Sequence, residues 1–444
     1  MPDSLSEVSV QSSRAVASIS IETKTIRKVQ IRIMPFIFLL YVVAFLDRVN
    51  IGFAALTMNK ELAITSQQYG LLSGIFFIGY FLFEIPSNLL MHKIGARIWI
   101  SRILITWGFV AALTGFVHSV HELYIVRFLL GLAEAGYAPG IILYLTYWFP
   151  QRQLAKAIAL FMMGAPVASI LGAPISGLIL DHVHWLAISS WRWLLILEGV
   201  PAIVCGVLTY FLLPSRPTEA TFLARDEKDC IIAKLAREEQ EKSSEHSLSA
   251  LQALSHRRVW HLACISFTFQ IGVYAILFWM PQAVRSVSSL YSNTVVGFLV
   301  MIPYLASLVA MILVSRSSDR MMERRYHAAL PPLVAGISLI LLGAAGPPWL
   351  SIALWSFAAM GLSYNGPFWS LPNEFLVGAS AASGIALINS VGSLGGFVGP
   401  FVIGTVAKYG GRIYKGLALA GISFFISATL VLLLPKKPQP LAKS

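Results

Sequence analysis

Long apolar segments recur along the whole of this 444-residue chain, and they restrict its fold more than any other feature. Many of them reach about 18 nearly uncharged residues, which is enough to cross a hydrocarbon layer of roughly 30 Å as a helix. Hydrophobic residues make up 57% of the chain and charged residues only 12%. A soluble fold could not bury so much apolar surface, and the alternating pattern of barrel strands is absent. We therefore predict an all-α membrane protein.

Twelve membrane-spanning helices are predicted, and one long polar segment divides them into two bundles of six. The expected spans are 33–58, 68–91, 96–117, 121–147, 154–180, 190–213, 259–284, 291–315, 328–346, 348–371, 376–406 and 413–434. The domains are then a polar tail (1–32), a first bundle (33–213), a linker (214–257), a second bundle (258–435) and a second tail (436–444).

The two polar regions outside the bundles carry their own predictions. Residues 1–23 have no apolar segment typical of a cleaved signal peptide, and we expect them to be mobile. The linker contains a charged helical piece from Arg225 to Lys242. Phe222, Ile232 and Leu235 give this piece one apolar face, which we expect to lie on the membrane surface.

The net charge of +12 is unevenly distributed over the predicted loops. Of the 33 Lys and Arg residues, 25 fall in the tails and alternate loops, whereas six fall in the other loops. This is the pattern of the positive-inside rule, and it predicts that both termini are cytoplasmic. Nucleic-acid binding is not expected. Three cysteines (Cys205, Cys230 and Cys264) are too few and too scattered to predict a disulfide framework.

The two halves of the chain resemble each other. Aligning Lys93 with Arg320, in the loops after spans 2 and 8, gives an offset of 227 residues, and aligning Pro174 with Pro400 gives 226. Two unrelated features with nearly the same offset indicate an internal duplication. Transporters are often built from such repeats, with the substrate bound midway across the membrane between them.

The loops after spans 2 and 8 resemble the G-x3-D-[RK]-x-G-x-[RK]-[RK] motif of the major facilitator superfamily. The first copy has Asn88 and His92 in place of the leading Gly and the Asp, whereas the second keeps Asp319 and Arg320. The resemblance implies a conformational latch, better supported in the second half. The residues expected to serve the conformational change, in these loops and in two Gly-Pro segments, are Lys93, Gly95, Arg97, Asp319, Arg320, Gly172, Pro174, Gly399 and Pro400.

The segments Asp47–Lys60 and Gly79–Arg97 resemble most closely the bacterial tartrate-transporter-like branch of the anion:cation symporter family. Three further segments resemble that family as a whole. They are Phe45–Ile51, Arg127–Gly140 and Tyr147–Pro150. The resemblance covers nearly all of residues 25–435. It implies transport of an organic anion such as a sugar acid, tartrate or an aromatic acid.

Four charged residues lie in the interior of the predicted spans 33–58 and 121–147: Asp47, Arg48, Arg127 and Glu134. Each such charge costs roughly 2.5–3.5 kcal/mol on insertion scales, so it is rarely retained without a role. Because they sum to zero, a purely structural network is one interpretation. Against it, buried ion pairs add little stability, and the repeat places Tyr274, Ala275, Leu354 and Gly361 at the corresponding positions of the second half.

The functional hypothesis assigns each charge a role. Arg48 would hold the substrate carboxylate, because a guanidinium offers a planar fork and keeps its charge. Glu134 would be the main protonation site, coupled to Asp47, and Arg127 would pair with whichever acid is ionised or contact the substrate. The family resemblance implies similar roles. A monocarboxylate plus one proton would restore neutrality, whereas a dicarboxylate would require two.

Polar and aromatic residues inside the second-half spans are expected to select the substrate. They are Gln270, Tyr274, Trp279, Asn365, Trp369, Ser370 and Asn389. The resemblance supports Trp369 and Asn389 as binding positions, and it implies that Tyr80 faces the cavity. Of the other buried acids, Glu84 is interpreted as a gate or packing group and Glu198 as a structural partner of Arg192.

The sequence therefore predicts a monomeric secondary transporter of a bacterial inner membrane that imports an organic carboxylate together with protons. No enzyme activity, metal site or cofactor is expected, apart from the proton as coupling ion, and no ATP-binding motif occurs. The alternatives are an antiporter or exporter of the same fold, an anion exchanger, or a membrane-bound enzyme or sensor.

Overall fold

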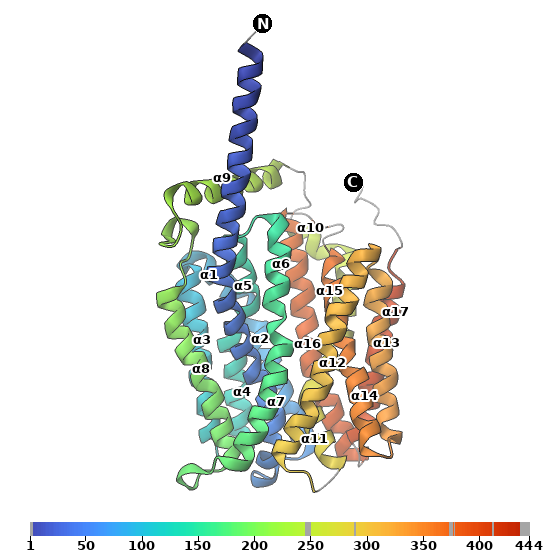
Figure 1. Cartoon of the computed structure of the whole chain (residues 1–444). Helices are drawn as coiled ribbons and strands as arrows, with labels where there is room; N and C mark the ends of the chain where they lie inside the picture. The colour runs from blue at the N-terminus through green and yellow to red at the C-terminus, as the bar shows by residue number, and fades with distance from the viewer. Residues whose placement is uncertain are drawn as a thin grey trace.

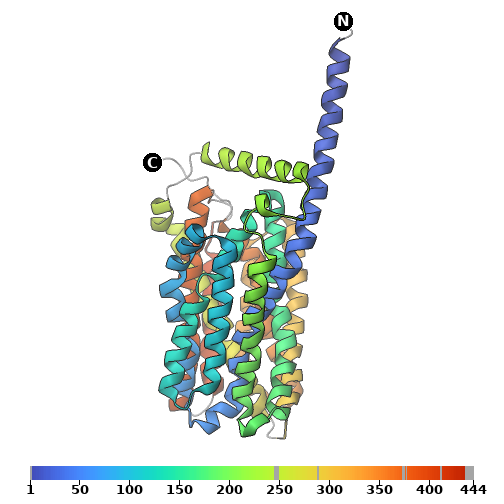
Figure 2. The same cartoon turned by 90° about the vertical axis from the view of Figure 1, so that its left-hand side faces the viewer.

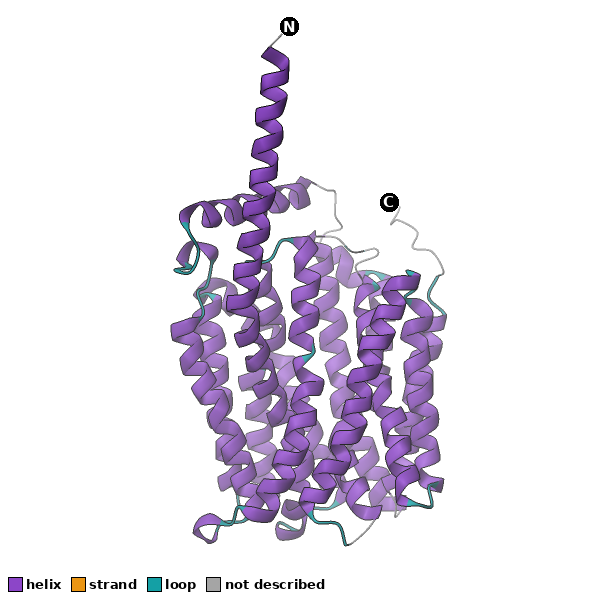
Figure 3. Cartoon of the chain, viewed as in Figure 1, coloured by secondary structure: helices purple, strands orange, loops and turns teal. Residues whose placement is uncertain are grey.

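Helices form the whole regular structure of the described chain. The computed structural model describes residues 3–244, 250–287, 290–372, 376, 378–410 and 413–435. Within these residues no strand occurs, as the purple ribbon of Figure 3 shows. The helices run side by side in one bundle, from which a single long helix projects (Figures 1 and 2). The all-α prediction is confirmed.

The first half contains two broken spans. Its helices are α1 (Asp3–Glu61), α2 (Ser66–Ile94), α3 (Ala96–Leu113), α4 (Val120–Glu134), α5 (Tyr137–Thr146), α6 (Gln151–Met162), α7 (Gly164–His182) and α8 (Ser190–Leu212). The predicted fourth span breaks between α4 and α5, where Gly136 has a φ of 81° in the left-handed region that favours glycine. The predicted fifth span breaks at Met163. The first break leaves Glu134, the last residue of α4, at mid-depth.

The second half contains one more broken span. Its helices are α11 (Arg257–Val287), α12 (Asn293–Met321), α13 (Arg325–Leu341), α14 (Pro348–Met360), α15 (Asn365–Ser370), α16 (Gly378–Gly410) and α17 (Ile413–Leu432). Eleven described segments are long and apolar enough to cross a membrane. The one predicted span outside this set, 348–371, is the tenth along the chain, and it is divided between α14, a 3-10 turn at Gly361–Tyr364 and α15.

The linker helix packs on the protein. Its described parts include α9 (Arg225–Ser244) and α10 (Ala250–Ser255), and α9 crosses α1 at the end of the bundle from which α1 projects (Figure 1). Phe222, Ile232 and Leu235 pack against the hydrophobic core, and the Phe222 ring stacks on Trp148 with ring centroids 6.0 Å apart. The apolar face predicted from the sequence is present, but it packs on the protein, whereas the prediction placed it on the membrane surface.

The N-terminal segment is continuous with the first span. Residues 1–23 were expected to be mobile because they have no apolar pattern, yet α1 is helical from Asp3. Ion pairs join this part of α1 to α9: Lys28 with Glu227, and Lys234 with Glu22. The ion pairs of Glu22 and Lys28 therefore attach α1 to the linker helix shortly before the first span.

Glu227 should make the attachment of α9 to α1 sensitive to acid. The hydrogen bond from Lys28 Nζ, 2.8 Å from Oε2, lowers the pKa of this carboxyl, and the backbone N–H of Ala224 lowers it further. A lowered folded-state pKa means that the stabilisation is complete above the unfolded value of about 4.3 and is lost as the pH falls through the folded value. We expect the distance between spin labels on α1 and α9 to broaden below about pH 4.

Substitution of Glu227 tests the same contact at neutral pH. Glu227→Gln removes the charge and should give the broadened distance distribution at every pH. Asp229→Asn removes a charge from an exposed position of the same helix and is the matched control. A wild-type distribution in Glu227→Gln would contradict the prediction.

The two halves are in contact at the end of the bundle away from α9. There the Asp181 carboxylate of α7 accepts hydrogen bonds from the first backbone amides of α12, at 3.2 Å from Asn293 N and 2.7 Å from Thr294 N. An acid at a helix N-terminus satisfies unpaired N–H groups and complements the helix dipole. On the opposite side α2 approaches α16 so closely that a methyl group at Gly70 would collide with the Pro400 carbonyl.

Candidate functional site

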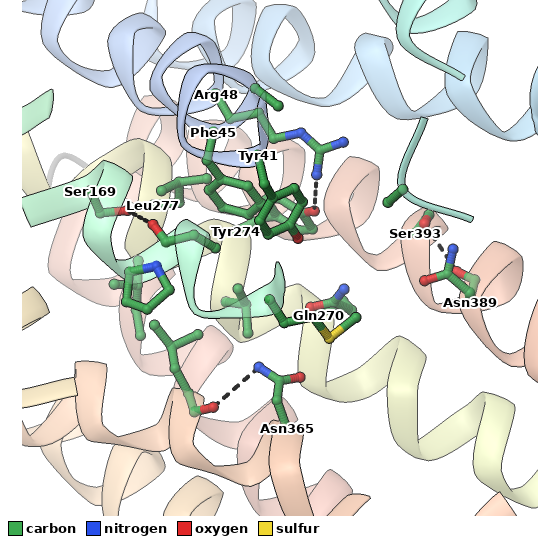
Figure 4. Close-up of a pocket in the computed structure, with 18 of the residues that line it drawn as sticks. Tyr41, Phe45, Arg48, Ser169, Gln270, Tyr274, Leu277, Asn365, Asn389 and Ser393 are labelled. Carbon is green, nitrogen blue, oxygen red and sulfur yellow. Dashed lines mark hydrogen bonds between the residues drawn. The ribbon is translucent and has the colours of Figure 1, made fainter. Parts of the chain in front are cut away.

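A cavity of about 200 Å³ lies between the two halves, with residues from both on its walls (Figure 4). Aromatic, hydroxyl and amide side chains predominate. Among the described residues that line it, the charged ones are Arg48 and Glu134. The principal polar and aromatic lining residues are Tyr41, Phe45, Phe77, Tyr80, Tyr137 and Ser169 from the first half, and Gln270, Tyr274, Tyr304, Asn365, Trp369, Asn389 and Ser393 from the second.

Arg48 and Glu134 form an ion pair in this cavity. Arg48 Nε donates to Glu134 Oε1 at 3.0 Å, and Nη2 contacts the same oxygen. Nη1 donates to the Tyr274 hydroxyl, 3.3 Å away on the other half (Figure 4). The guanidinium carbon also lies 5.3 Å from the Phe45 ring centroid and 5.6 Å from that of Tyr80, distances at which aromatic rings attract a cation. The arginine is thus held in place while its fork faces the cavity.

The other two intramembrane charges do not line the cavity. Asp47 is 3% exposed; its Oδ1 accepts from Asn50 Nδ2 at 3.0 Å, and its Oδ2 from Trp107 Nε1 at 2.8 Å. Arg127 is equally buried, with its guanidinium carbon 5.3 Å from the Phe76 ring centroid. The four charges are therefore divided between a cavity pair and a sealed region behind it. Direct contact of Arg127 with substrate, as the sequence suggested, has no support in this arrangement.

Five of the seven second-half candidates reach the cavity. Gln270 and Tyr274 come from α11, Asn365 and Trp369 from α15, and Asn389 from α16. Of the other two, Trp279 is fully buried and packs edge-on against Tyr69, with ring centroids 5.0 Å apart. Ser370 donates to its own helix at the Gly366 carbonyl, 3.2 Å away. The first-half candidate Tyr80 also lines the cavity, as expected.

Glu84 joins the halves beside the cavity. It is 3% exposed on α2, and its two oxygens accept from Asn389 Nδ2 at 2.8 Å and from Ser390 Oγ at 2.7 Å, both on α16. An ionised carboxylate can only accept, so it holds the amide nitrogen of Asn389 and leaves the amide oxygen for another partner. Glu84 is therefore placed to orient a cavity residue, which the sequence interpretation as a gate or packing group did not specify.

Glu84→Gln is expected to raise the KM for transport at least about tenfold, with a smaller change in maximal rate, because a charge-assisted hydrogen bond that positions Asn389 is worth roughly 1.5–3 kcal/mol. Initial rates of uptake into proteoliposomes over a range of substrate concentrations would measure this. Ser390→Ala removes the other hydrogen bond to Glu84 at a position that does not line the cavity, and KM should stay within about twofold of wild type. Equal KM values in Glu84→Gln and wild type would count against a positioning role.

Several lining residues were not predicted. Tyr41, Tyr137, Ser169 and Tyr304 all contribute hydroxyl groups to the cavity, and Glu84 supports it. In the sequence these tyrosines stand in apolar runs that look the same whether they face a cavity, a neighbouring helix or lipid. The sequence did contain an indication for Tyr41. It lies one helical turn from Phe45 and two from Arg48, on the same face of α1.

The residues expected to serve the conformational change lie at two kinds of place. Lys93, Gly95 and Arg97 surround the turn between α2 and α3, where Gly95 has a φ of 98°. Arg97 Nη1 lies 3.9 Å from Glu219 of the linker. Asp319 is paired with Arg324 at 2.5 Å, beside Arg320 at the end of α12. Pro174 lies against Gly297 of α12, Pro400 against Gly70 of α2, Gly172 against Leu46 of α1, and Gly399 against Ile271 of α11.

Glu198 does not pair with Arg192, so that prediction is wrong. Arg192 Nη1 donates to the carbonyl of Gly115 at 3.0 Å, and its Nη2 lies 3.4 Å from Glu61. Glu198 instead accepts from Ser176 Oγ at 2.9 Å. The two residues are six positions apart on α8, which is close to neither one helical turn nor two.

Sequence comparisons identify close relatives over nearly the whole chain. A protein of Agrobacterium vitis named "Putative tartrate transporter" is 43% identical over 94% of this chain and 96% of its own length. The quinolone resistance transporter of Acinetobacter baumannii is 36% identical over 90% and 92% of the two chains. The inner membrane transport protein RhmT of Escherichia coli is 38% identical over 85% and 87%.

Solved structures share the fold at low sequence identity. A D-xylose–proton symporter superposes with a TM-score of 0.72 over 91% of this chain and 97% of that one, at 15% identity. A bacterial homologue of the human lysosomal transporter Spinster, in an inward-facing conformation, gives 0.68 over 91% and 95%, at 16% identity. The family model described as Major Facilitator Superfamily matches residues 37–400. This chain is a multi-pass membrane protein that belongs to the Major Facilitator Superfamily, a family of transporters and not of enzymes.

Proposed function

We propose that this transporter is a proton-coupled symporter that imports an organic carboxylate by alternating access. The observation that carries the proposal is the Arg48–Glu134 ion pair in a cavity between the halves. An arginine at mid-membrane suits capture of a carboxylate, and the acid that neutralises it suits uptake of a proton. The substrate carboxylate would then compete with Glu134 for Arg48, and the proton would compete with Arg48 for Glu134.

Charge balance links the two events. The empty cavity pair is neutral with Arg48 charged and Glu134 ionised. A substrate carboxylate that takes Arg48 as its partner leaves Glu134 without a counter-charge in a poorly solvated site, which favours its protonation. One monoanion and one proton restore neutrality. A dicarboxylate such as tartrate would call for a second proton, for which Asp47 is the nearby acceptor.

The lining residues favour a substrate with hydroxyl groups or an aromatic ring. Gln270, Asn365 and Asn389 offer amide hydrogen bonds, and Tyr80 and Trp369 offer aromatic faces. Pockets that combine a few placed polar groups with aromatic walls fix the orientation of a small ligand. A hydroxy or sugar acid, such as tartrate, or an aromatic acid fits this chemistry, and the names of the Agrobacterium relatives support the first class.

The distribution of Lys and Arg residues supports cytoplasmic termini in a bacterial inner membrane. The end of the bundle that carries α9 is then cytoplasmic, and the end where Asp181 meets α12 faces outward (Figure 1). The contacts between halves at the outward end would belong to a state closed to the outside. Transport would require them to break while the cytoplasmic ends approach each other.

Uptake by proteoliposomes tests the proposal. The purified protein is reconstituted and offered hydroxy acids, sugar acids and aromatic acids, with a pH gradient that is acidic outside. We expect accumulation of at least one acid, which a protonophore abolishes. Uptake that depends on neither the pH gradient nor the protonophore would contradict proton coupling.

An exporter is the second candidate, because one relative bears the name quinolone resistance transporter. The same vesicles distinguish it when a quinolone is added to the panel. An inward proton gradient that expels a preloaded quinolone, with no uptake of any acid, would favour the exporter.

A further inference from the structure

A buried polar cluster lies behind the cavity in the first half, and the function proposed above does not use all of it. We call it the sealed cluster: Asp47 and Asn50 on α1, Trp107 on α3, Ser176 on α7 and Glu198 on α8. None of the five lines the cavity. All are 5% exposed or less. Hydrogen bonds connect Asp47 to Asn50 and Trp107, and Ser176 to Glu198.

Two acceptor atoms in the sealed cluster have no donor. Within the described part of the chain, neither Glu198 Oε2 nor Asn50 Oδ1 has a hydrogen-bond partner. Asn50 is a polar neighbour of the Glu198 carboxyl, and its Nδ2 donates to Asp47 at 3.0 Å. A buried acceptor without a partner costs about 1–3 kcal/mol, and a buried unpaired carboxylate costs more. A proton on Glu198 would supply the missing donor and remove the charge.

The charges around Glu198 also favour a proton there. The Asp47 carboxylate repels a second negative charge at Glu198. Asp47 in turn interacts with Arg127 and Glu134. With Asp47 ionised and Arg127 charged, the region is neutral only when Glu198 is protonated. Two carboxyl groups and one guanidinium in a dry region thus require one proton.

The depth of Glu198 differs from that of Asp47. It lies eight residues from the start of α8, about 12 Å from the end of the bundle away from α9. Asp47 lies 14 residues from the end of α1, about 21 Å from the same end of the bundle. Glu198 is therefore the buried acid of this cluster closer to the side from which protons would enter.

We propose that Glu198 is a second proton-binding site of the transporter, which binds and releases one proton during the transport cycle. The proton binds to Glu198 Oε2 and leaves from the same oxygen, with no change in bonding elsewhere, so that Glu198 alternates between the neutral and the ionised form. The site makes the first half respond to outside pH independently of Glu134. This inference rests on the proton-coupled function proposed above.

Glu198→Gln is the decisive variant, because glutamine copies the shape and hydrogen bonds of the protonated acid but cannot titrate. We expect proton-driven accumulation to fall at least tenfold and its pH dependence to flatten, while counterflow of substrate without a gradient stays within twofold of wild type. The control Ser101→Ala removes another buried hydrogen bond to α8, at the Gly206 carbonyl, and should keep the wild-type pH profile. A wild-type profile in Glu198→Gln would overturn the proposal, as would equal loss of counterflow.

Infrared spectroscopy tests the proton itself, without transport. The protein in detergent at neutral pH should show the C=O stretch of a protonated carboxylic acid that is lost in Glu198→Gln and retained in Ser101→Ala. Absence of this band would overturn the Glu198 assignment even if transport is proton-coupled. If the band is present but uptake does not depend on the proton gradient, the proposed symport is contradicted. Glu198 would then still be protonated, but it would have no role in proton-coupled transport.

Discussion

Glu134→Gln is expected to abolish accumulation of substrate against a gradient while substrate exchange across the membrane continues. Glutamine can still accept from Arg48 through Oε1, so the guanidinium keeps its position, but the side chain no longer takes up a proton. For one proton per monoanion, a pH difference of one unit sustains about tenfold accumulation, because one pH unit corresponds to 1.36 kcal/mol. The variant should reach a ratio of about one.

Paired measurements in the same vesicles check this result. Net uptake driven by a pH gradient reports coupling, whereas counterflow of labelled substrate reports binding and the conformational change. Glu122→Gln changes an exposed acid in the first turn of the same helix and should leave both unchanged. Wild-type accumulation in Glu134→Gln would place the coupling acid elsewhere, with Asp47 and Glu198 as the next candidates.

Arg48→Lys is expected to weaken substrate binding by roughly 10- to 150-fold, although the charge is kept. The guanidinium uses Nε and Nη2 for Glu134 and Nη1 for Tyr274 at the same time. A lysine ammonium has no planar fork and cannot reproduce this geometry. Loss of one charge-assisted hydrogen bond to the substrate is worth about 1.5–3 kcal/mol, which corresponds to the expected range.

Binding in detergent measures this effect without transport. Isothermal titration with the best substrate of the uptake panel gives Kd for wild type and variant. Arg102→Lys is the matched control, because Arg102 on α3 packs over the Trp99 ring and does not line the cavity. An unchanged Kd in Arg48→Lys would mean that another group holds the carboxylate.

One contact of the site joins nearly equivalent positions of the two repeats. The offset of 227 places Tyr274 opposite Asp47, one position from the place opposite Arg48. In the structure the Tyr274 hydroxyl contacts Arg48, 226 residues away. Helices α1 and α11 occupy equivalent positions in the two halves, so equivalent residues meet where the halves face each other.

The division of the four intramembrane charges was not predictable. Asp47 and Arg48 are adjacent in sequence, and their side chains point about 100° apart on a helix. Which of the two faces the cavity depends on the rotation of α1 against α3 and α11, where Trp107 takes the Asp47 carboxylate and Tyr274 meets Arg48. No pattern within α1 encodes that rotation, because the helix is apolar on all sides.

The contact between Glu84 and Asn389 shows the same limit. The sequence identifies both as polar residues in apolar spans, 305 positions apart. Nothing in either span indicates that they meet, because the contact requires α2 and α16 to lie side by side. The close approach of these helices depends on glycines such as Gly70, because any side chain at that position would collide with the backbone of Pro400.

The sequence by itself determined the membrane-spanning helices, their division into two halves, the superfamily, and the four intramembrane charges Asp47, Arg48, Arg127 and Glu134. These follow from properties that are local along the chain: hydropathy over a span, charge in loops, and the cost of an ion in lipid. Only the tertiary structure decided which charges line the cavity, that Glu84 positions Asn389, and that Glu198 joins Asp47 in a sealed cluster. Those features depend on how each helix is rotated and on packing between distant segments. In a span that is almost entirely apolar, no local sequence pattern encodes either.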